Sequence, residues 1–165
     1  MTIAELLADA FGRVREVVYE AVDGLTPGQL ALRPESEANS IAWLIWHLTR
    51  VQDDHVADAF GVAQAWPQWK AQFGLTGDDV GYGHSSAQVA RVRASAAVLA
   101  GYHDAVHEQT IKLVSGVTDA DLPRIVDRRW DPPVTLAVRL VSVVSDTLQH
   151  VGQAAFVRGI VLRAG

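Results

Sequence analysis

The sequence predicts an all-α protein that folds as a four-helix bundle, and three observations support this fold class. Four long stretches, each of roughly 20 to 30 residues, repeat apolar side chains at helical spacing. Most of them begin at a capping residue and end before a glycine. No stretch shows the alternation of a convincing β-strand. Long helices with apolar faces and no partner sheet pack against each other as a bundle.

Size and composition indicate one domain spanning residues 1–165. A chain of 165 residues can bury a sizeable core. The formal net charge is −5 and Lys and Arg do not cluster, so we expect no nucleic-acid partner. The N-terminus lacks a signal-peptide pattern, and no apolar stretch approaches the ~18 residues of a membrane helix. We therefore expect a cytoplasmic protein without a membrane partner.

The chain contains no cysteine, which limits its chemistry. Disulfides, a thiolate nucleophile and cysteine-type zinc sites are excluded. Any thiol chemistry would need a thiol supplied by a substrate. Motifs of serine hydrolases, P-loop proteins and Rossmann domains are absent, so these classes have no support.

Local signals place the first two helices. A capping box of Thr2 with Glu5 opens the first helix, which ends at Gly24. Asn39-Ser40 caps the second helix, which runs to the residue before Gly61. One face of this second helix mixes apolar with ionisable side chains, which an ordinary core stripe would not do because unpaired buried charge is costly. That face carries Ser40, Trp43, Leu44, His47, Arg50, Val51, Asp54 and Asp58.

Residues 61–84 form a long connection rich in glycine and aromatic residues. Its length indicates a functional loop, and it permits a crossover between helices that are not antiparallel neighbours. A cap at Ser85 predicts a third helix over 85–114. Residues 118–133 are predicted to be irregular.

Thr135 opens the fourth predicted helix, which should run to about Arg158, before Gly159. It is apolar on most sides and carries one polar line, so we expect it to be buried with that line facing the bundle interior. The line contains Arg139, Asp146, His150 and Gln153.

Asp146 and His150 lie four residues apart and so share one helix face, one turn apart. With His47 they make a set of two histidines and a carboxylate. Three protein ligands leave a coordination position open, which is typical of catalytic zinc and also suits ferrous iron or nickel. The alternative is a solvated helix pair or an internal hydrogen bond, because this spacing often occurs by chance.

His103 and His107 form a second pair at the same spacing. They could bind a metal, but His103 lies on an apolar stripe, where a lone histidine is more often a satisfied core residue; a supporting or substrate contact is a further reading. In Gly81-Tyr82-Gly83-His84, glycines before a helix N-terminus allow backbone to approach a ligand, and the alternative is a flexible loop with a surface histidine.

Arg50 and Arg139 lie on the same faces as the proposed ligands. One of them could clamp a substrate carboxylate. The alternative is ion pairing, for Arg50 with Asp54 at i+4.

Three segments together resemble the DinB-like (YfiT-like) superfamily of small bacterial metalloproteins, most closely its actinobacterial branch. They are Trp43-Leu44-Ile45-Trp46-His47-Leu48-Thr49-Arg50, Trp130-Asp131-Pro132-Pro133-Val134-Thr135-Leu136 and Asp146-Thr147-Leu148-Gln149-His150-Val151-Gly152-Gln153. The resemblance spans nearly the whole chain. It implies a four-helix bundle with a long crossover between the second and third helices.

The resemblance also implies a divalent metal, usually zinc or nickel, held by His47, Asp146 and His150. Many members have histidine where this chain has Asp146, whereas the similar mycothiol-dependent maleylpyruvate isomerase has glutamate there. Several relatives are S-transferases that use mycothiol or bacillithiol. We therefore expect a metal-dependent thiol S-transferase, most simply with Zn²⁺ and with Ni²⁺ or Fe²⁺ as alternatives.

The expected partners are a low-molecular-weight thiol and a small electrophile or xenobiotic, with a homodimer as an alternative assembly. Arg50, His84 and His103 are the expected substrate or supporting contacts. Two other functions stay open: a metal-dependent hydrolase or isomerase that activates water, and a non-catalytic, stress-associated metal-binding module.

Overall fold

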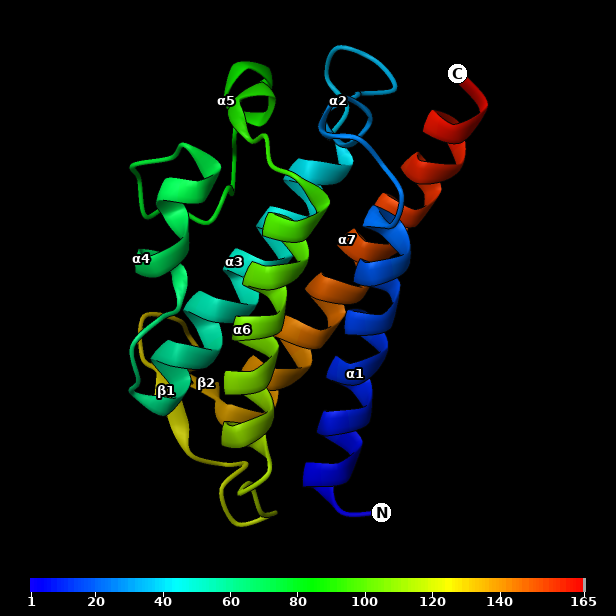
Figure 1. Cartoon of the computed structure of the whole chain (residues 1–165). Helices are drawn as coiled ribbons and strands as arrows, with labels where there is room; N and C mark the ends of the chain where they lie inside the picture. Colours follow the sequence, from blue (N-terminus) through cyan, green and yellow to red (C-terminus); the bar gives the residue numbers. More distant parts are fainter. Residues whose placement is uncertain (165) are drawn as a thin grey trace.

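In the computed structural model, which describes residues 1–164, four long helices form a bundle (Figure 1). They are α1 (Ile3–Val22), α3 (Ile41–Phe60), α6 (Ala96–Val114) and α7 (Leu136–Ala164). Each packs against two others, in the order α1, α7, α3, α6 around the bundle. Helices α3 and α6 run in one direction and α1 and α7 in the other. The predicted four-helix bundle with a long crossover is confirmed.

The predicted capping signals act at the first two long helices. Thr2 and Glu5 form the expected capping box, and the Ser40 hydroxyl accepts a hydrogen bond from the Trp43 backbone N–H, 3.1 Å away. Gly61 ends α3 in a left-handed conformation with φ of 67°, which suits glycine. Both ends of α3 are therefore where the sequence predicts them.

Helix α3 is the central element of the bundle. Most of its side chains are buried, on both the mixed face and the apolar face. The core around it contains Leu44, Ile45, Trp46 and Leu48, together with apolar side chains from α1, α6 and α7. Burial of this much apolar surface is the main stabilising contribution to such a bundle.

The prediction of one continuous third helix is wrong, because the structure has two helices, α5 and α6, in its place. Helix α5 (Ser86–Arg91) ends at Val92, whose extended backbone breaks the helical pattern. Helix α6 starts afresh with the Ser95 hydroxyl capping the Val98 N–H at 3.3 Å. A serine competes for backbone hydrogen bonds and favours a helix start over a helix interior.

The crossover between α3 and α6 contains short elements of its own. Residues Trp66–Trp69 form α4, which continues into a 3₁₀ turn over Lys70–Phe73. Another short helix, α2 (Pro27–Leu30), lies between α1 and α3. The crossover packs beside α3 in Figure 1 and so can bring residues 79–84 to the bundle.

The segment predicted to be irregular contains a small antiparallel pair of strands, β1 (Ile125–Asp127) and β2 (Val134–Thr135). The strands are too short to give a sequence pattern. They join α6 to the start of α7 and place Asp127 against that helix, where it pairs with Arg139.

Two expectations for the fourth helix are wrong. Helix α7 continues through Gly159 to Ala164, because a single glycine costs a helix only about 1 kcal/mol. Its outward side is not buried, since α7 packs against the bundle on one side only. Large apolar side chains exposed there include Val138, Val141, Leu148, Phe156 and Leu162.

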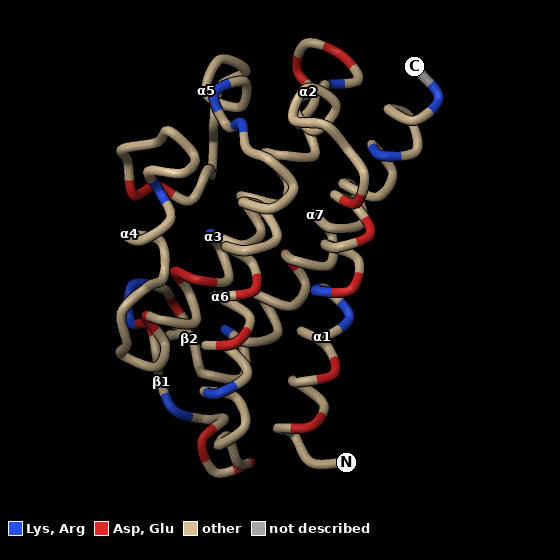
Figure 2. Tube along the Cα trace, viewed as in Figure 1, with Lys and Arg blue, Asp and Glu red and all other residues tan. Residues whose placement is uncertain are grey.

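Charged side chains are distributed over several elements (Figure 2). Lys and Arg occur among Asp and Glu along the helices and loops. Within the described residues, none of the helices combines the length and the apolar character needed to cross a bilayer.

Candidate metal centre

His47, Asp146 and His150 converge from α3 and α7 to form the candidate metal centre. Their ligand-type atoms all lie within 4.8 Å of one another. His150 Nε2 is 3.8 Å from Asp146 Oδ2, one turn away on α7. The His47 and His150 rings meet edge to face with centroids 4.8 Å apart. The bundle therefore brings His47 to a pair of residues that lie about a hundred positions later in the sequence.

Hydrogen bonds determine which nitrogen of each histidine is free. His47 Nδ1 faces the Val80 carbonyl oxygen, so this nitrogen carries the proton and donates it. His150 Nδ1 donates in the same way to Gln153 Oε1 at 2.9 Å. Both rings then keep a lone pair on Nε2. Metal-binding histidines are oriented by acceptors of this kind.

Asp146 supplies a direct observation on whether a cation fits. Its Oδ1 atom is buried and has no hydrogen-bond partner within the described residues. A buried carboxylate oxygen without a partner is costly. Burial also lowers the pKa of His47, which keeps that imidazole neutral at pH 7. Two imidazoles and one carboxylate are donors that suit a divalent cation.

An aromatic wall holds the His47 ring in place. Trp43 stacks on His47 with centroids 4.6 Å apart and planes 12° apart. The Trp43 indole N–H donates to His84 Nδ1 at 3.1 Å, and His84 Nε2 donates to Asp79 at 2.6 Å. His84, expected as a substrate or supporting contact, is thus placed behind Trp43, where it supports the wall.

Gly81 explains how the crossover reaches His47. Its φ is +97°, which glycine adopts easily and other residues rarely do. A Cβ atom there would lie 2.9 Å from His47 Nδ1 and 2.8 Å from the Trp46 ring. From the sequence, the glycines of this segment allowed either a backbone approach to a ligand or a flexible loop with a surface histidine. The structure shows that the approach is to His47, which receives the neighbouring Val80 carbonyl.

Comparison with known proteins identifies the family. Residues 6–162 match the family described as mycothiol-S-transferase. The chain belongs to this family. The resemblance predicted from the three sequence segments is thereby confirmed.

A solved structure supports the fold of this family member. The crystal structure of a conserved protein from Enterococcus faecalis superposes with a TM-score of 0.90 at 26% sequence identity. The match covers 98% of each chain. No curated protein matches the chain.

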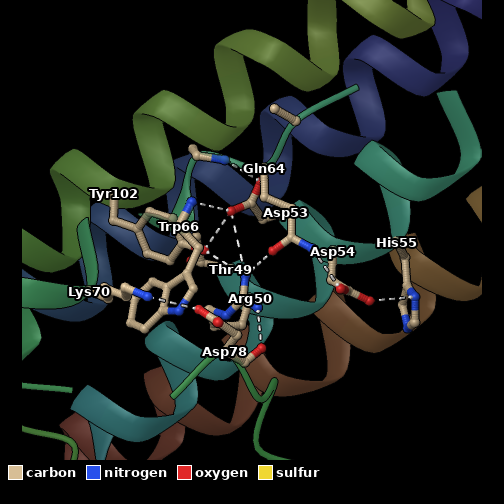
Figure 3. Close-up of polar contacts among 12 residues, drawn as sticks. Thr49, Arg50, Asp53, Asp54, His55, Gln64, Trp66, Lys70, Asp78 and Tyr102 are labelled. Atoms are coloured by element: carbon tan, nitrogen blue, oxygen red, sulfur yellow. Dashed lines mark hydrogen bonds and ion pairs between the residues drawn. The ribbon is translucent and has the colours of Figure 1, made fainter. Parts of the chain in front are cut away.

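Arg50 lies away from solvent in this mycothiol-S-transferase family member (Figure 3). Its guanidinium donates to the backbone carbonyls of Asp78 and Asp79 and to Gln64. It pairs with Asp53, three residues on, at 3.5 Å, and not with Asp54 as the alternative reading had it. These contacts tie α3 to the crossover, so the position of Arg50 indicates a structural role.

Asp53 continues the same network. It accepts hydrogen bonds from the backbone N–H groups of Ala65 and Trp66 and from the Tyr102 hydroxyl, at 2.8 to 2.9 Å. Burial raises the pKa of Asp53 and of Tyr102. This network anchors the start of the crossover, whose far end carries Val80 and Gly81 to the candidate metal centre.

His103 is fully buried between α3 and α6, away from the centre. Its Nδ1 lies 3.2 Å from the Thr49 hydroxyl. Burial lowers the pKa of His103 to about 3. The structure does not bring His103 together with His47, Asp146 or His150. His103 is a core histidine, but its Nε2 is buried without a hydrogen-bond partner among the described residues.

Several residues beside the centre were not predicted from the sequence. The Tyr82 ring meets the His47 ring edge to face, with ring centroids 5.2 Å apart. The His55 ring centroid lies 6.5 Å from that of Tyr82. His55 follows His47 by eight positions and so shares its helix face, a signal that was available. Asp127, which pairs with Arg139 at 2.8 Å, gave no signal because a short strand places it. For Arg139, this pairing favours the ion-pair reading.

Proposed function

We propose that this protein is a metal-dependent S-transferase that conjugates mycothiol, or a similar low-molecular-weight thiol, to electrophiles. The observation that carries the proposal is the cluster of His47, Asp146 and His150, in which the buried Asp146 Oδ1 lacks a partner. Membership of the mycothiol-S-transferase family supports the thiol. The absence of cysteine is consistent with a thiol that arrives with the substrate. We place the reaction in the cytoplasm, where thiols are kept reduced.

A divalent cation held by the three side chains would supply a positive charge that lowers the pKa of a nearby thiol. In the reaction, the thiolate sulfur forms a bond to an electrophilic carbon. The bond from that carbon to its leaving group breaks, and the leaving group departs with the electron pair. The thiol proton passes to solvent.

The chain's own residues prepare the site for this reaction. Val80 and Gln153 hold the two imidazoles in the tautomers that leave Nε2 free. Trp43 and His84 restrict the His47 ring. Such pre-positioning means that little reorganisation is needed when the substrates bind.

Zn²⁺ is the metal that we propose, with Ni²⁺ and Fe²⁺ as the alternatives that the same donors accept. Asp146 makes the donor set more anionic and harder than a set of three histidines. This donor set favours a divalent ion over a softer monovalent one.

Elemental analysis of the purified protein tests the metal requirement. We expect about one equivalent of metal per chain, because a catalytic site binds one ion through three protein ligands. A metal-free protein that stays inactive after addition of Zn²⁺ or Ni²⁺ would exclude both this function and a metal-dependent hydrolase.

Conjugation of mycothiol to monochlorobimane tests the reaction. In this assay the sulfur–carbon bond forms and chloride leaves. We expect wild type to accelerate conjugation and His150→Ala to lose the acceleration. Conjugation that survives in His150→Ala would show that the centre is assigned wrongly, and wild type without conjugation would argue against S-transfer.

A further inference from the structure

Two pockets lie on opposite sides of the candidate metal centre along α7. The first has a volume of about 630 Å³ and includes Tyr82 and Ser142, the latter one turn before Asp146. The second has a volume of about 550 Å³ and includes Gln153, three residues after His150. Ser142 and Gln153 are separated by roughly 16 Å along the helix axis at 1.5 Å per residue. A pair of substrates that meet at the centre could thus occupy one pocket each.

Most of the residues that line the first pocket, called the polar pocket below, have polar side chains, and its charged groups pair with one another. Asp127 accepts hydrogen bonds from Arg129 at 2.9 Å and from Arg139 at 2.8 Å. Arg129 also approaches Asp58 at 3.9 Å. Burial lowers the pKa of His55, which leaves that ring uncharged. A ligand here meets many donors and acceptors, and the charged ones already pair with one another, which favours a neutral polyhydroxylated group over an anion.

Trp130 adds an apolar surface to this polar pocket. Its side chain is 67% exposed although it is the largest apolar group there. An exposed indole can pack against the C–H face of a sugar-like ring while surrounding polar groups bind the hydroxyls. Tyr82 connects the pocket to the centre, because its ring also contacts His47.

The second pocket is an apolar groove between α7, the start of α3 and the loop before it. Leu44, Phe156, Val157 and Ile160 line it, and Phe156 is 70% exposed. Gln153 lies at its edge and accepts the hydrogen bond from His150. A group bound in this groove is therefore next to a candidate metal ligand. Such a groove favours a ligand with an apolar part, because binding removes apolar surface of both from water.

We propose that the two pockets divide the substrates: the polar pocket binds the sugar part of the thiol, and the apolar groove binds the apolar part of the electrophile. The inference rests on the proposed S-transferase function. Mycothiol carries its cysteinyl thiol on a neutral glucosaminyl-inositol, which matches the polar pocket with Trp130. The electrophile class that follows is one with an aromatic ring or a short alkyl chain beside its reactive carbon.

Calorimetric titration of the zinc-loaded protein tests the division without using catalysis. The probes are mycothiol and its thioether S-benzyl mycothiol, which carries both substrate parts. The variants are Trp130→Ala and Phe156→Ala, both at exposed side chains whose loss should not unfold the bundle. Leu148→Ala is the matched control, because Leu148 is an exposed apolar residue of α7 that lines neither pocket.

We expect Trp130→Ala to weaken both probes by about tenfold, and Phe156→Ala to weaken only S-benzyl mycothiol by a similar factor. Leu148→Ala should change neither. If both variants affect the two probes equally, or if neither has an effect, the division is overturned. Should wild type still conjugate mycothiol in that case, the S-transferase function stands and only the pocket assignment fails. A wild type that does not bind mycothiol contradicts the function itself.

Discussion

Helices α6 and α7 each carry a pair of metal-type side chains four residues apart, yet the two pairs have different surroundings. Asp146 and His150 on α7 are half-buried and meet His47 from α3. His103 on α6 is fully buried, and the group of three that the described residues form does not include it. A spacing of four residues on one helix places two side chains on the same face and does no more than that. A third ligand from another helix distinguishes a candidate centre from a core pair.

The supporting hydrogen bonds differ in the same way. His47 and His150 each donate Nδ1–H to an oxygen, which leaves Nε2 for a ligand. His103 instead contacts the Thr49 hydroxyl, and its Nε2 is buried without a partner in the described part of the chain. The α6 pair therefore costs stability when protonated, whereas the α7 pair is the one that we propose binds a cation.

The largest expected effect is on metal affinity when a ligand is removed. Replacing His47 by Ala should lower zinc affinity by more than the 10- to 100-fold that loss of a supporting partner costs. Replacing His103 by Ala should leave zinc affinity unchanged. Competition with a chromophoric chelator measures both. Equal losses in the two variants would remove the distinction between the pairs.

Changes in the crossover should affect the candidate metal centre but not the His103–His107 pair on α6. Gly81→Ala forces a strained φ and a contact with His47 and Trp46, so we expect a loss of about 1–3 kcal/mol in unfolding free energy and a weaker zinc site. Gly83→Ala is the control, since Gly83 also has a positive φ of 70° but no atom within 4 Å of its Cβ position. Denaturant unfolding measures the stability of the two variants, and chelator competition measures their zinc affinity. Equal losses in both variants would contradict a specific role for the contact of Gly81 with His47.

The α6 pair should make stability depend on pH. His103 binds a proton with a pKa of about 3 when folded, against 6.5 as its ordinary value. Between these values the unfolded chain holds more protons, so stability is full above pH 6.5 and falls as pH decreases towards 3. The slope should reach about 1.4 kcal/mol per pH unit.

His103→Gln should remove this contribution. Urea unfolding at pH 7, 6 and 5 measures the difference between wild type and variant. Asp104, Arg15 and His107 also act on His103, and His107→Gln serves as a control at a half-buried histidine of the same helix. Parallel pH profiles for wild type and His103→Gln would show that His103 is not held neutral by burial.

The smallest expected effect concerns the acceptor behind His150. Gln153→Ala should lower zinc affinity by about tenfold, because His150 loses the oxygen that orients its ring. Gln149→Ala is the control, since that glutamine on α7 bonds to Ser145 instead. Unchanged affinity in Gln153→Ala would mean that Gln153 does not orient the ring.

Much of the bundle could be predicted because its signals are local. Thr2, Ser40 and Gly61 act on neighbouring backbone groups, and their effects are independent of the rest of the chain. The break at Ser95 was missed because the apolar stripe continues across it. The exposure of Val141 and Leu148 was missed because periodicity cannot tell how many sides of a helix are covered.

The candidate centre was predictable only as a set of residue types. His47, Asp146 and His150 followed from shared faces together with the family resemblance. The Val80 carbonyl could not be predicted, because a backbone oxygen has no residue type and its position depends on the path of the crossover. For Arg50, the place on the same helix face as His47 left substrate contact and ion pairing both open, because its hydrogen-bond partners Gln64, Asp78 and Asp79 lie in the crossover and could not be placed from the sequence.

Anomalous X-ray scattering at the zinc absorption edge, on crystals of the zinc-loaded protein, tests the central claim most directly. We expect one peak per chain at about 2.0–2.1 Å from Nε2 of His47 and of His150 and about 2.0–2.2 Å from an oxygen of Asp146. A peak beside His103 and His107, or no peak within ligand distance of His47, would contradict the assignment of the α7 pair as the metal centre.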